Sequence, residues 1–486
     1  MLKRVNLAFE YGLLLSLLVA GEALSAAYWI FFPYLSVLTT FAQADAIVVD
    51  ALSPFSPALL LMLLYSWIGM LLYKHSNRFS RRLRAFLGPV SSSVKSLFTH
   101  SVSGKGLRLL NHPRTLAFIG ILGALFLSVI PYRPDLNPNG IPVGIDFHYY
   151  IEWIGPMLEK SPGGALYYAM GVASGGSRPL LLIPVYLAVS TGTVSLVHAV
   201  EALPAILGPL LVLSIFFFVS ETFGDEKLAG IAALATPFSF YVTVGIWAGY
   251  YANMLALSVG FAFLTLLFRY WKKQTIVGLF WLILSSIGLL LAHPWTWVIV
   301  LTATATFAAT TWWAVRKPMI VKTVGLVLVV DLLIDIAKSL VFGASVSVQE
   351  ASGSFITGLV PTPTIDFWPN IVSGLFGAYD GLLANTLILV LSLIAIISFR
   401  PDSLARRFLL VWVAVSSIPI LVLSDLAQTR IFYNLPFPIF TALGLLLVQR
   451  VKGLGLHSNL VFSVIVLALA NYALRSVTSL GAIPSP

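Results

Sequence analysis

The chain alternates between long apolar stretches and short polar segments. Charge-free runs such as 115–131, 206–219 and 254–268 reach, with their apolar flanks, the roughly 20 residues needed to cross about 30 Å of hydrocarbon. A membrane β-barrel would instead show short segments of alternating hydrophobicity. The pattern therefore predicts an all-α polytopic membrane protein of about thirteen transmembrane helices. The expected spans lie near 12–33, 56–73, 115–131, 197–220, 228–244, 252–268, 276–292, 295–314, 322–341, 382–399, 408–424, 435–449 and 457–474.

The apolar segment 179–190 is too short for a full span and contains Pro184. Counting it as a span would move Arg269, Lys272 and Lys273 to the outer side of the membrane. We therefore expect a re-entrant or interfacial helix here.

Composition agrees with a membrane protein, because 58% of residues are apolar, 10% are charged and the mean hydropathy is +0.94. The net charge is +10, yet 23 of the 29 Lys and Arg residues fall in segments that the predicted topology places in the cytoplasm. This asymmetry predicts a cytoplasmic N-terminus and an outer C-terminus. The excess charge then serves topology and lipid headgroups, and no nucleic-acid partner is expected. Cysteine is absent, which excludes thiolate chemistry.

Two unequal parts are predicted. Residues 1–112 hold two spans and a basic cytoplasmic segment, and residues 113–486 form the main transmembrane body. Two long outer loops, 132–178 and 343–380, interrupt this body, the first of them directly after its first span.

A polar island, 144–153, stands out in the first outer loop. It carries Asp146, His148 and Glu152 among aromatic residues. If Asp146 starts a helix, its carboxylate either caps the first turn or acts as a general base or metal ligand at the membrane edge. Asp146 and His148 are the metal-ligand candidates, for a divalent cation such as Mg²⁺ or Mn²⁺, although the spacing specifies no one metal.

Arg178 and Arg430 also fall on the outer side, against the orientation bias. Each is either a headgroup anchor or a ligand for an anion such as a lipid phosphate. Tyr433 follows Arg430 in the same turn. His293, in an outer turn between two spans, is either a helix-end histidine or a donor in the same pocket, and Tyr250 lies in an aromatic turn suited to the membrane belt or to a sugar ring.

One predicted span, 322–341, contains ionisable residues. Asp331 and Asp335 lie four positions apart, and Lys338 can pair with Asp335 at i,i+3. Intramembrane carboxylates face the bundle interior or water. They keep open a proton-coupled transporter, while a structural ion pair is equally compatible with the sequence.

The order of several short motifs over about 113–486 resembles the GT-C superfamily of polytopic glycosyltransferases, which use lipid-phosphate-linked sugars. The motifs, in chain order, are Gly-Ile-Asp-Phe-His-Tyr-Tyr at 144–150, Ser-Arg-Pro-Leu-Leu at 177–181, Thr-Phe-Gly at 222–224, Ala-Ala-Leu-Ala-Thr-Pro at 232–237, Ala-Gly-Tyr-Tyr-Ala-Asn at 248–253, Leu-Ala-His-Pro at 291–294 and the Pro-rich turn at 430–438.

The resemblance implies a glycosyltransferase that moves a sugar from a polyprenyl- or dolichyl-phosphate donor to a lipid, glycan or protein acceptor on the outer face. Asp146 would be the base, and Arg178, Arg430 and His293 would hold the lipid phosphate. Two rivals remain: a transporter or flippase for a lipid-linked or small anionic substrate, and an assembly subunit without catalysis. The other expected substrate-binding residues are Tyr250, Tyr433 and Glu152.

Overall fold

The computed structural model describes residues 112–316, 318–345, 386–398, 403–422, 430–449 and 458–478. Helices dominate these residues, and no strand occurs among them. The predicted spans 12–33 and 56–73, the basic segment before residue 112 and most of the second outer loop lie outside the described part. The helices are α6 (Pro113–Val129), η4 (Ile130–Tyr132), α7 (Phe147–Leu158), α8 (Pro162–Gly171), η5 (Ala173–Gly176), α9 (Pro179–Ser190), α10 (Leu196–Glu201), α11 (Leu203–Phe223), α12 (Glu226–Ala235), α13 (Phe240–Ala248), α14 (Tyr251–Lys272), α15 (Ile276–Ala292), α16 (Pro294–Val315), α17 (Pro318–Phe342), α20 (Thr386–Ile397), α21 (Leu404–Val422), α23 (Phe437–Gln449) and α24 (Ser458–Thr478).

The membrane character of the protein is confirmed. In the described part, six helical segments, some of them made of two consecutive helices, are long and apolar enough to cross a bilayer, and four further apolar helices are shorter. Exposed faces of the outer helices are apolar, with Phe118 on α6 and Phe280 on α15 each more than half exposed. Such faces suit lipid rather than water. The total of thirteen spans stays a prediction.

Close helix packing holds the bundle together. The helices α6, α11 and α12 pack against one another, and α11 packs along α14. A Cβ built on Gly120 would lie 2.4 Å from the Ala233 carbonyl oxygen, so α6 approaches α12 at backbone distance. Small residues at such crossings are the common way in which membrane helices pack.

The predicted span 228–244 is two helices rather than one. The helix α12 ends at Ala235 and α13 begins at Phe240, with Pro237 between them. A proline inside a helix removes a backbone donor and clashes with the preceding turn, so it favours this break. The Ala232 carbonyl accepts both from the Thr236 N–H at 3.0 Å and from the Thr236 hydroxyl at 2.7 Å, where α12 ends.

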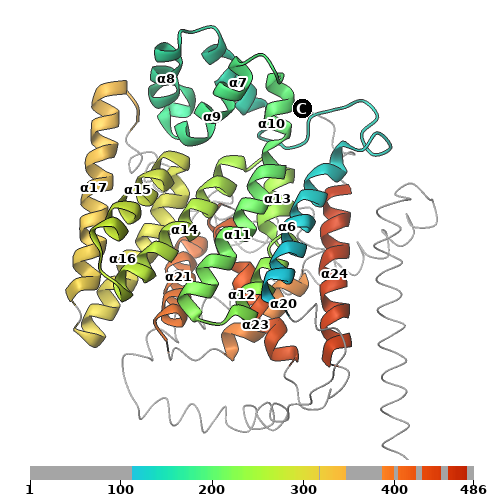
Figure 1. Cartoon of the computed structure of the whole chain (residues 1–486), viewed down its shortest axis with the longest axis vertical. Helices are drawn as coiled ribbons and strands as arrows, with labels where there is room; N and C mark the ends of the chain where they lie inside the picture. Colours follow the sequence, from blue (N-terminus) through green and yellow to red (C-terminus); the bar gives the residue numbers. More distant parts are fainter. Residues whose placement is uncertain are drawn as a thin grey trace, which may run out of the picture.

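The helices α7, α8 and α9 (residues 147–190, here called the cap) gather at one end of the bundle, with α10 beside them (Figure 1). The helix α9 contains 12 residues, about 18 Å in length, which is too short to span a membrane. It contacts α7, α8 and α15, as expected for an interfacial element rather than a full crossing.

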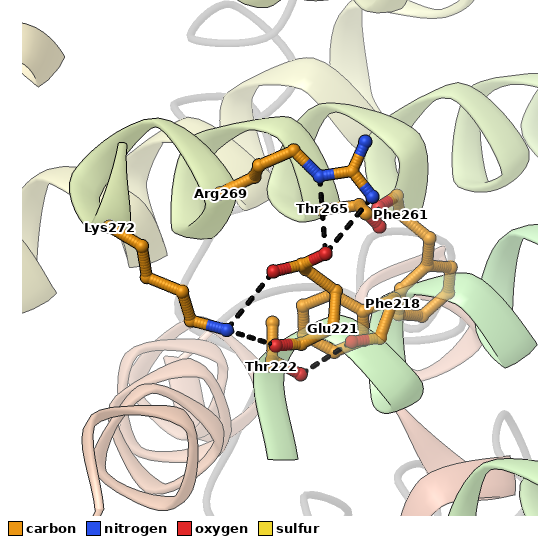
Figure 2. Close-up of polar contacts among 7 residues, drawn as sticks. All are labelled: Phe218, Glu221, Thr222, Phe261, Thr265, Arg269 and Lys272. Atoms are coloured by element: carbon orange, nitrogen blue, oxygen red, sulfur yellow. Dashed lines mark hydrogen bonds and ion pairs between the residues drawn. The ribbon is translucent and has the colours of Figure 1, made fainter. Parts of the chain in front are cut away.

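At the other end of the bundle, an ion cluster ties α11 to α14. Figure 2 shows Glu221 between two cations of α14: Arg269 donates from Nε and Nη2 at 3.1 and 3.0 Å, and Lys272 donates at 3.0 Å. The Lys272 side chain also donates to the Glu221 carbonyl. The cluster therefore closes the end of this helix pair that lies away from the cap.

Candidate functional site

The first outer loop is attached to the bundle through its backbone. The Ile145 N–H donates to the Trp247 carbonyl at 3.1 Å, and the Asp146 N–H donates to the Ala248 carbonyl at 3.0 Å. These bonds place Asp146 at the turn between α13 and α14, one residue before the start of the cap. The position of the carboxylate is therefore set by main-chain contacts between segments about a hundred residues apart in the sequence.

Two glycines make this approach possible. Gly144 and Gly249 have φ values of +116° and +71°. A Cβ on Gly144 would lie 3.1 Å from the Gly249 Cα, and a Cβ on Gly249 would lie 3.0 Å from the Asp146 nitrogen. A larger residue would be strained at both positions and would push the two segments apart.

Buried tyrosines fasten the cap helix α7 to α14. The Tyr251 hydroxyl donates to the Val143 carbonyl at 3.0 Å, and the Ala252 N–H donates to the Tyr150 hydroxyl at 3.1 Å. The rings of Tyr150 and Tyr251 stack with centroids 5.3 Å apart. Burial raises the pKa of Tyr150 to about 12, so its hydroxyl is neutral at physiological pH.

Asp146 occupies the N-cap position of α7 but makes no side-chain capping bond. Its carboxylate is therefore not committed to the helix end. The side chain is only half-buried, and burial raises the pKa of Asp146 above the ordinary value. The positive charges of Arg178, Arg430 and His148 oppose that increase.

Two guanidinium groups act on this carboxylate. Arg178, at the start of α9, lies over the Trp153 ring with its Cζ 4.6 Å from the centroid, and its buried Nε has no hydrogen-bond partner in the described part of the chain. Arg430 lies over the Trp295 ring at 5.8 Å. A cation stacked on an aromatic face is held in place while its N–H groups remain available for an anion.

His293 belongs to the same electrostatic environment. It is 2% exposed, and its pKa lies well below the ordinary value because of burial and the nearby charges of Arg178 and Arg430. The Thr296 N–H donates to its Nδ1 at 3.3 Å and so caps α16. With Nδ1 accepting, the neutral ring carries its hydrogen on Nε2, which is the atom able to donate to a ligand.

The two predicted tyrosines contact each other. The rings of Tyr250 and Tyr433 meet edge to face at 5.4 Å. Tyr433 is fully buried and its hydroxyl donates to the Tyr241 carbonyl at 2.6 Å, so this hydroxyl serves the bundle. Tyr250 is partly exposed and is the better placed of the two to meet a ligand.

Glu152 and His148 are both exposed on α7, and the His148 ring contacts that of Tyr149 at 3.9 Å. Within the described ranges, no group of three or more His, Asp or Glu side chains is arranged to hold a metal ion. Asp146 and His148 alone would supply two protein ligands, so metal binding there stays a prediction.

The sequence did not predict which side chains hold Arg178 and Arg430 in place. Trp153 and Trp295 hold the two arginines, and the Asn434 side-chain amide donates to the Arg430 carbonyl at 2.7 Å. A tryptophan at each membrane interface is common, so the residue type gave no signal of this role. The structure thus brings Asp146, Arg178, His293 and Arg430 into one electrostatic cluster at the cap end.

Comparison with known proteins places this chain in no family: no family model matches it, and no curated protein is significantly similar. The geometry of the site therefore carries the functional argument.

Proposed function

We propose that this protein is a membrane glycosyltransferase that uses a polyprenyl- or dolichyl-phosphate sugar. One observation carries the proposal: a half-buried carboxylate with no capping bond shares its surroundings with two guanidinium groups, at one end of an apolar bundle. A carboxylate suits an acceptor hydroxyl, and paired guanidinium groups suit a phosphate. The membrane is the natural location of a donor that carries a long apolar chain.

In the proposed step, the Asp146 carboxylate accepts the proton of an acceptor hydroxyl. The acceptor oxygen attacks the anomeric carbon, and the bond from that carbon to the phosphate oxygen breaks. The lipid phosphate leaves with the electron pair, and the anomeric centre is inverted. Arg178 and Arg430 stabilise the charge that develops on the leaving phosphate, and the His293 Nε2–H can donate to it.

The orientation of the described basic residues supports a site on the outer face. Arg269 and Lys272 lie in the last turn of α14 and Arg316 follows the end of α16, and both helices begin at the cap end of the bundle. Basic residues favour the cytoplasmic side. The cap would then face outward, where lipid-linked donors serve extracytoplasmic acceptors.

The test has two stages. An untargeted comparison of glycans between parent cells and cells lacking the protein identifies the product without a guess about the sugar. Asp146→Asn then keeps the size of the side chain but removes the base, and transfer should fall by about 100-fold or more. Asp135→Asn is the matched control, because Asp135 is an exposed aspartate of the same loop that pairs with Arg133 at 2.6 Å. Near-parental transfer by a folded Asp146→Asn protein would refute the assignment.

A transporter is the second candidate, and one observation favours it. Asp331 is fully buried, and its Oδ1 has no hydrogen-bond partner in the described part, whereas Oδ2 accepts from Ser286 and Trp297 at 2.5 and 2.8 Å. A buried carboxylate with a free oxygen suits a proton or cation pathway. Proton-coupled substrate flux in proteoliposomes that Asp331→Asn abolishes, without any glycan difference, would favour this candidate.

A further inference from the structure

The helix α17 turns its ionisable residues inward. Asp331, Asp335 and Lys338 are at most 3% exposed, whereas Leu333 on the opposite side is 61% exposed. The positions i, i+4 and i+7 share one helix face, so the three groups form a polar row. The row runs from the Ser286 and Trp297 contacts of Asp331 toward the cap.

The cap end of this row contacts the backbone next to Arg178. The Lys338 Nζ lies 3.3 Å from the Asp335 Oδ1, and it donates to the Gly176 carbonyl at 3.1 Å. Gly176 lies two residues before Arg178. An ammonium group at this depth has to be paired and hydrogen-bonded, because burial without partners would cost several kcal/mol. The contact with the carbonyl therefore satisfies part of the hydrogen-bonding capacity of Lys338 inside the bundle.

The turn that receives this bond is conformationally costly. Ser174, Gly175 and Gly176 have φ values of +50°, +62° and +76° in succession. A left-handed serine is unfavourable, and consecutive glycines lose much backbone entropy when they are ordered. Such a turn persists only where its surroundings hold it.

Residues at and just after the end of α17 make further contacts with the turn. Besides Lys338, Ser345 donates to the Gly175 carbonyl from its N–H and from its hydroxyl, at 3.3 and 3.1 Å. A Cβ on Gly171, at the end of α8, would lie 2.1 Å from the Phe342 carbonyl oxygen. The cap helix α8 and the turn therefore both pack against residues at and just after the end of α17.

We infer that Lys338, supported by Asp335, is the positioning residue for the turn that carries Arg178. This inference rests on the proposed function, because it makes α17 responsible for placing one of the two guanidinium groups that would bind the phosphate. Arg178 lies two residues after Gly176 and is the N-cap residue of α9, so a displacement of Gly176 moves the guanidinium relative to Asp146 and Arg430. Lys338 itself touches no substrate.

The test removes both charges of the buried pair. Lys338→Met alone would remove the cation next to the buried Asp335 carboxylate, a change that is strongly destabilising. The double variant Asp335→Asn/Lys338→Met avoids an uncompensated charge. Lys322→Met is the matched control, because it removes an exposed lysine from the same helix.

Hydrogen exchange in the absence of ligand reports on the turn. The Gly175 N–H donates to the Val172 carbonyl and the Ser177 N–H to the Ser174 carbonyl, so both amides sense its closure. In the double variant, exchange over 172–178 should become about tenfold faster, and the Lys322→Met protein should match the parent. Unchanged exchange over 172–178 would overturn the inference.

A titration with a short-chain polyprenyl phosphate tests the link to Arg178. The double variant should weaken binding about tenfold, and this effect should largely disappear in an Arg178→Ala background, since residues that act through one another are non-additive. Additive losses would overturn the link. A parent protein that does not bind the probe would refute the proposed function, whereas faster exchange over 172–178 would still support the role of Lys338 in holding the turn.

Discussion

Gly249→Ala tests the backbone junction that places Asp146. Gly249 ends α13 in the left-handed conformation and lies against the Asp146 amide. Gly224 ends α11 in the same conformation, at φ +64°, but a Cβ there would have no neighbour within 4 Å. The pair of variants therefore separates backbone strain from contact with the loop.

The expected magnitudes follow from these two environments. A left-handed alanine costs roughly 1–2 kcal/mol at either position. At Gly249 the new Cβ would also lie 3.0 Å from the Asp146 nitrogen and 3.2 Å from the Phe147 nitrogen. Both of these neighbours are backbone atoms, so the loop has to move and the Asp146 N–H loses its bond to Ala248, worth about 0.5–1.5 kcal/mol. Gly249→Ala should therefore lower the free energy of unfolding by about 1 kcal/mol more than Gly224→Ala does.

Hydrogen exchange over 144–150 measures this difference locally, and thermal unfolding in detergent measures it globally. In Gly249→Ala, protection of the Ile145 and Asp146 amides should fall about tenfold for each 1.4 kcal/mol, while Gly224→Ala should leave the loop unchanged. Transfer activity should fall only in the first variant. Equal protection of the loop in both proteins would refute the argument that a backbone contact positions Asp146.

Four further outcomes are expected. Because burial raises the pKa of Asp146 and the base must be deprotonated, kcat/KM should decline with acidification at a pH above the usual aspartate range; a decline only in that usual range would contradict the role of burial. Binding of a short-chain polyprenyl phosphate should weaken in the order parent, Arg430→Lys, Arg430→Ala, because lysine keeps the charge without the planar fork; three equal dissociation constants would make Arg430 a headgroup anchor. Glu221→Gln should lower stability by no more than about 1 kcal/mol, because its partners are 59% and 57% exposed, and a larger loss in thermal unfolding would show that the cluster is more than a surface ion pair. Tyr433→Phe should cost about 0.5–1.5 kcal/mol by removing its buried hydrogen bond to the Tyr241 carbonyl, with little change in phosphate binding. A selective loss of binding would place its hydroxyl in the site.

The helices of the main body could be predicted well from hydropathy, because long charge-free segments leave few alternatives to a membrane helix. The short helix 179–190 was recognised as incomplete for the same reason. The break that divides 228–244 into two helices was not predicted, because a proline in a membrane helix often produces only a kink. Whether Pro237 breaks the helix depends on how neighbouring segments satisfy the freed backbone groups.

The site was predictable in residue type and less so in arrangement. Asp146, Arg178 and Arg430 were predicted because charged residues are costly in a largely apolar chain and therefore indicate a function. The Asp335–Lys338 pair was predicted from helical spacing. The contacts of Asp331 with Ser286 and Trp297, and of Lys338 with Gly176, join segments remote in sequence. Local patterns contain no information on such pairings, and the expected roles of Glu152 and His148 stay predictions.

The junction between the loop and the α13–α14 turn is built from amide groups and from glycines that have no side chain. Most amino acids supply the same amide hydrogen bonds, so substitutions around the two glycines can accumulate without moving the carboxylate. A distant homologue would then preserve a Gly-x-Asp motif and a second glycine about a hundred positions later, while most of the surrounding residues differ. Ancestry in such proteins is better sought in the spacing of a few backbone-critical positions than in overall similarity.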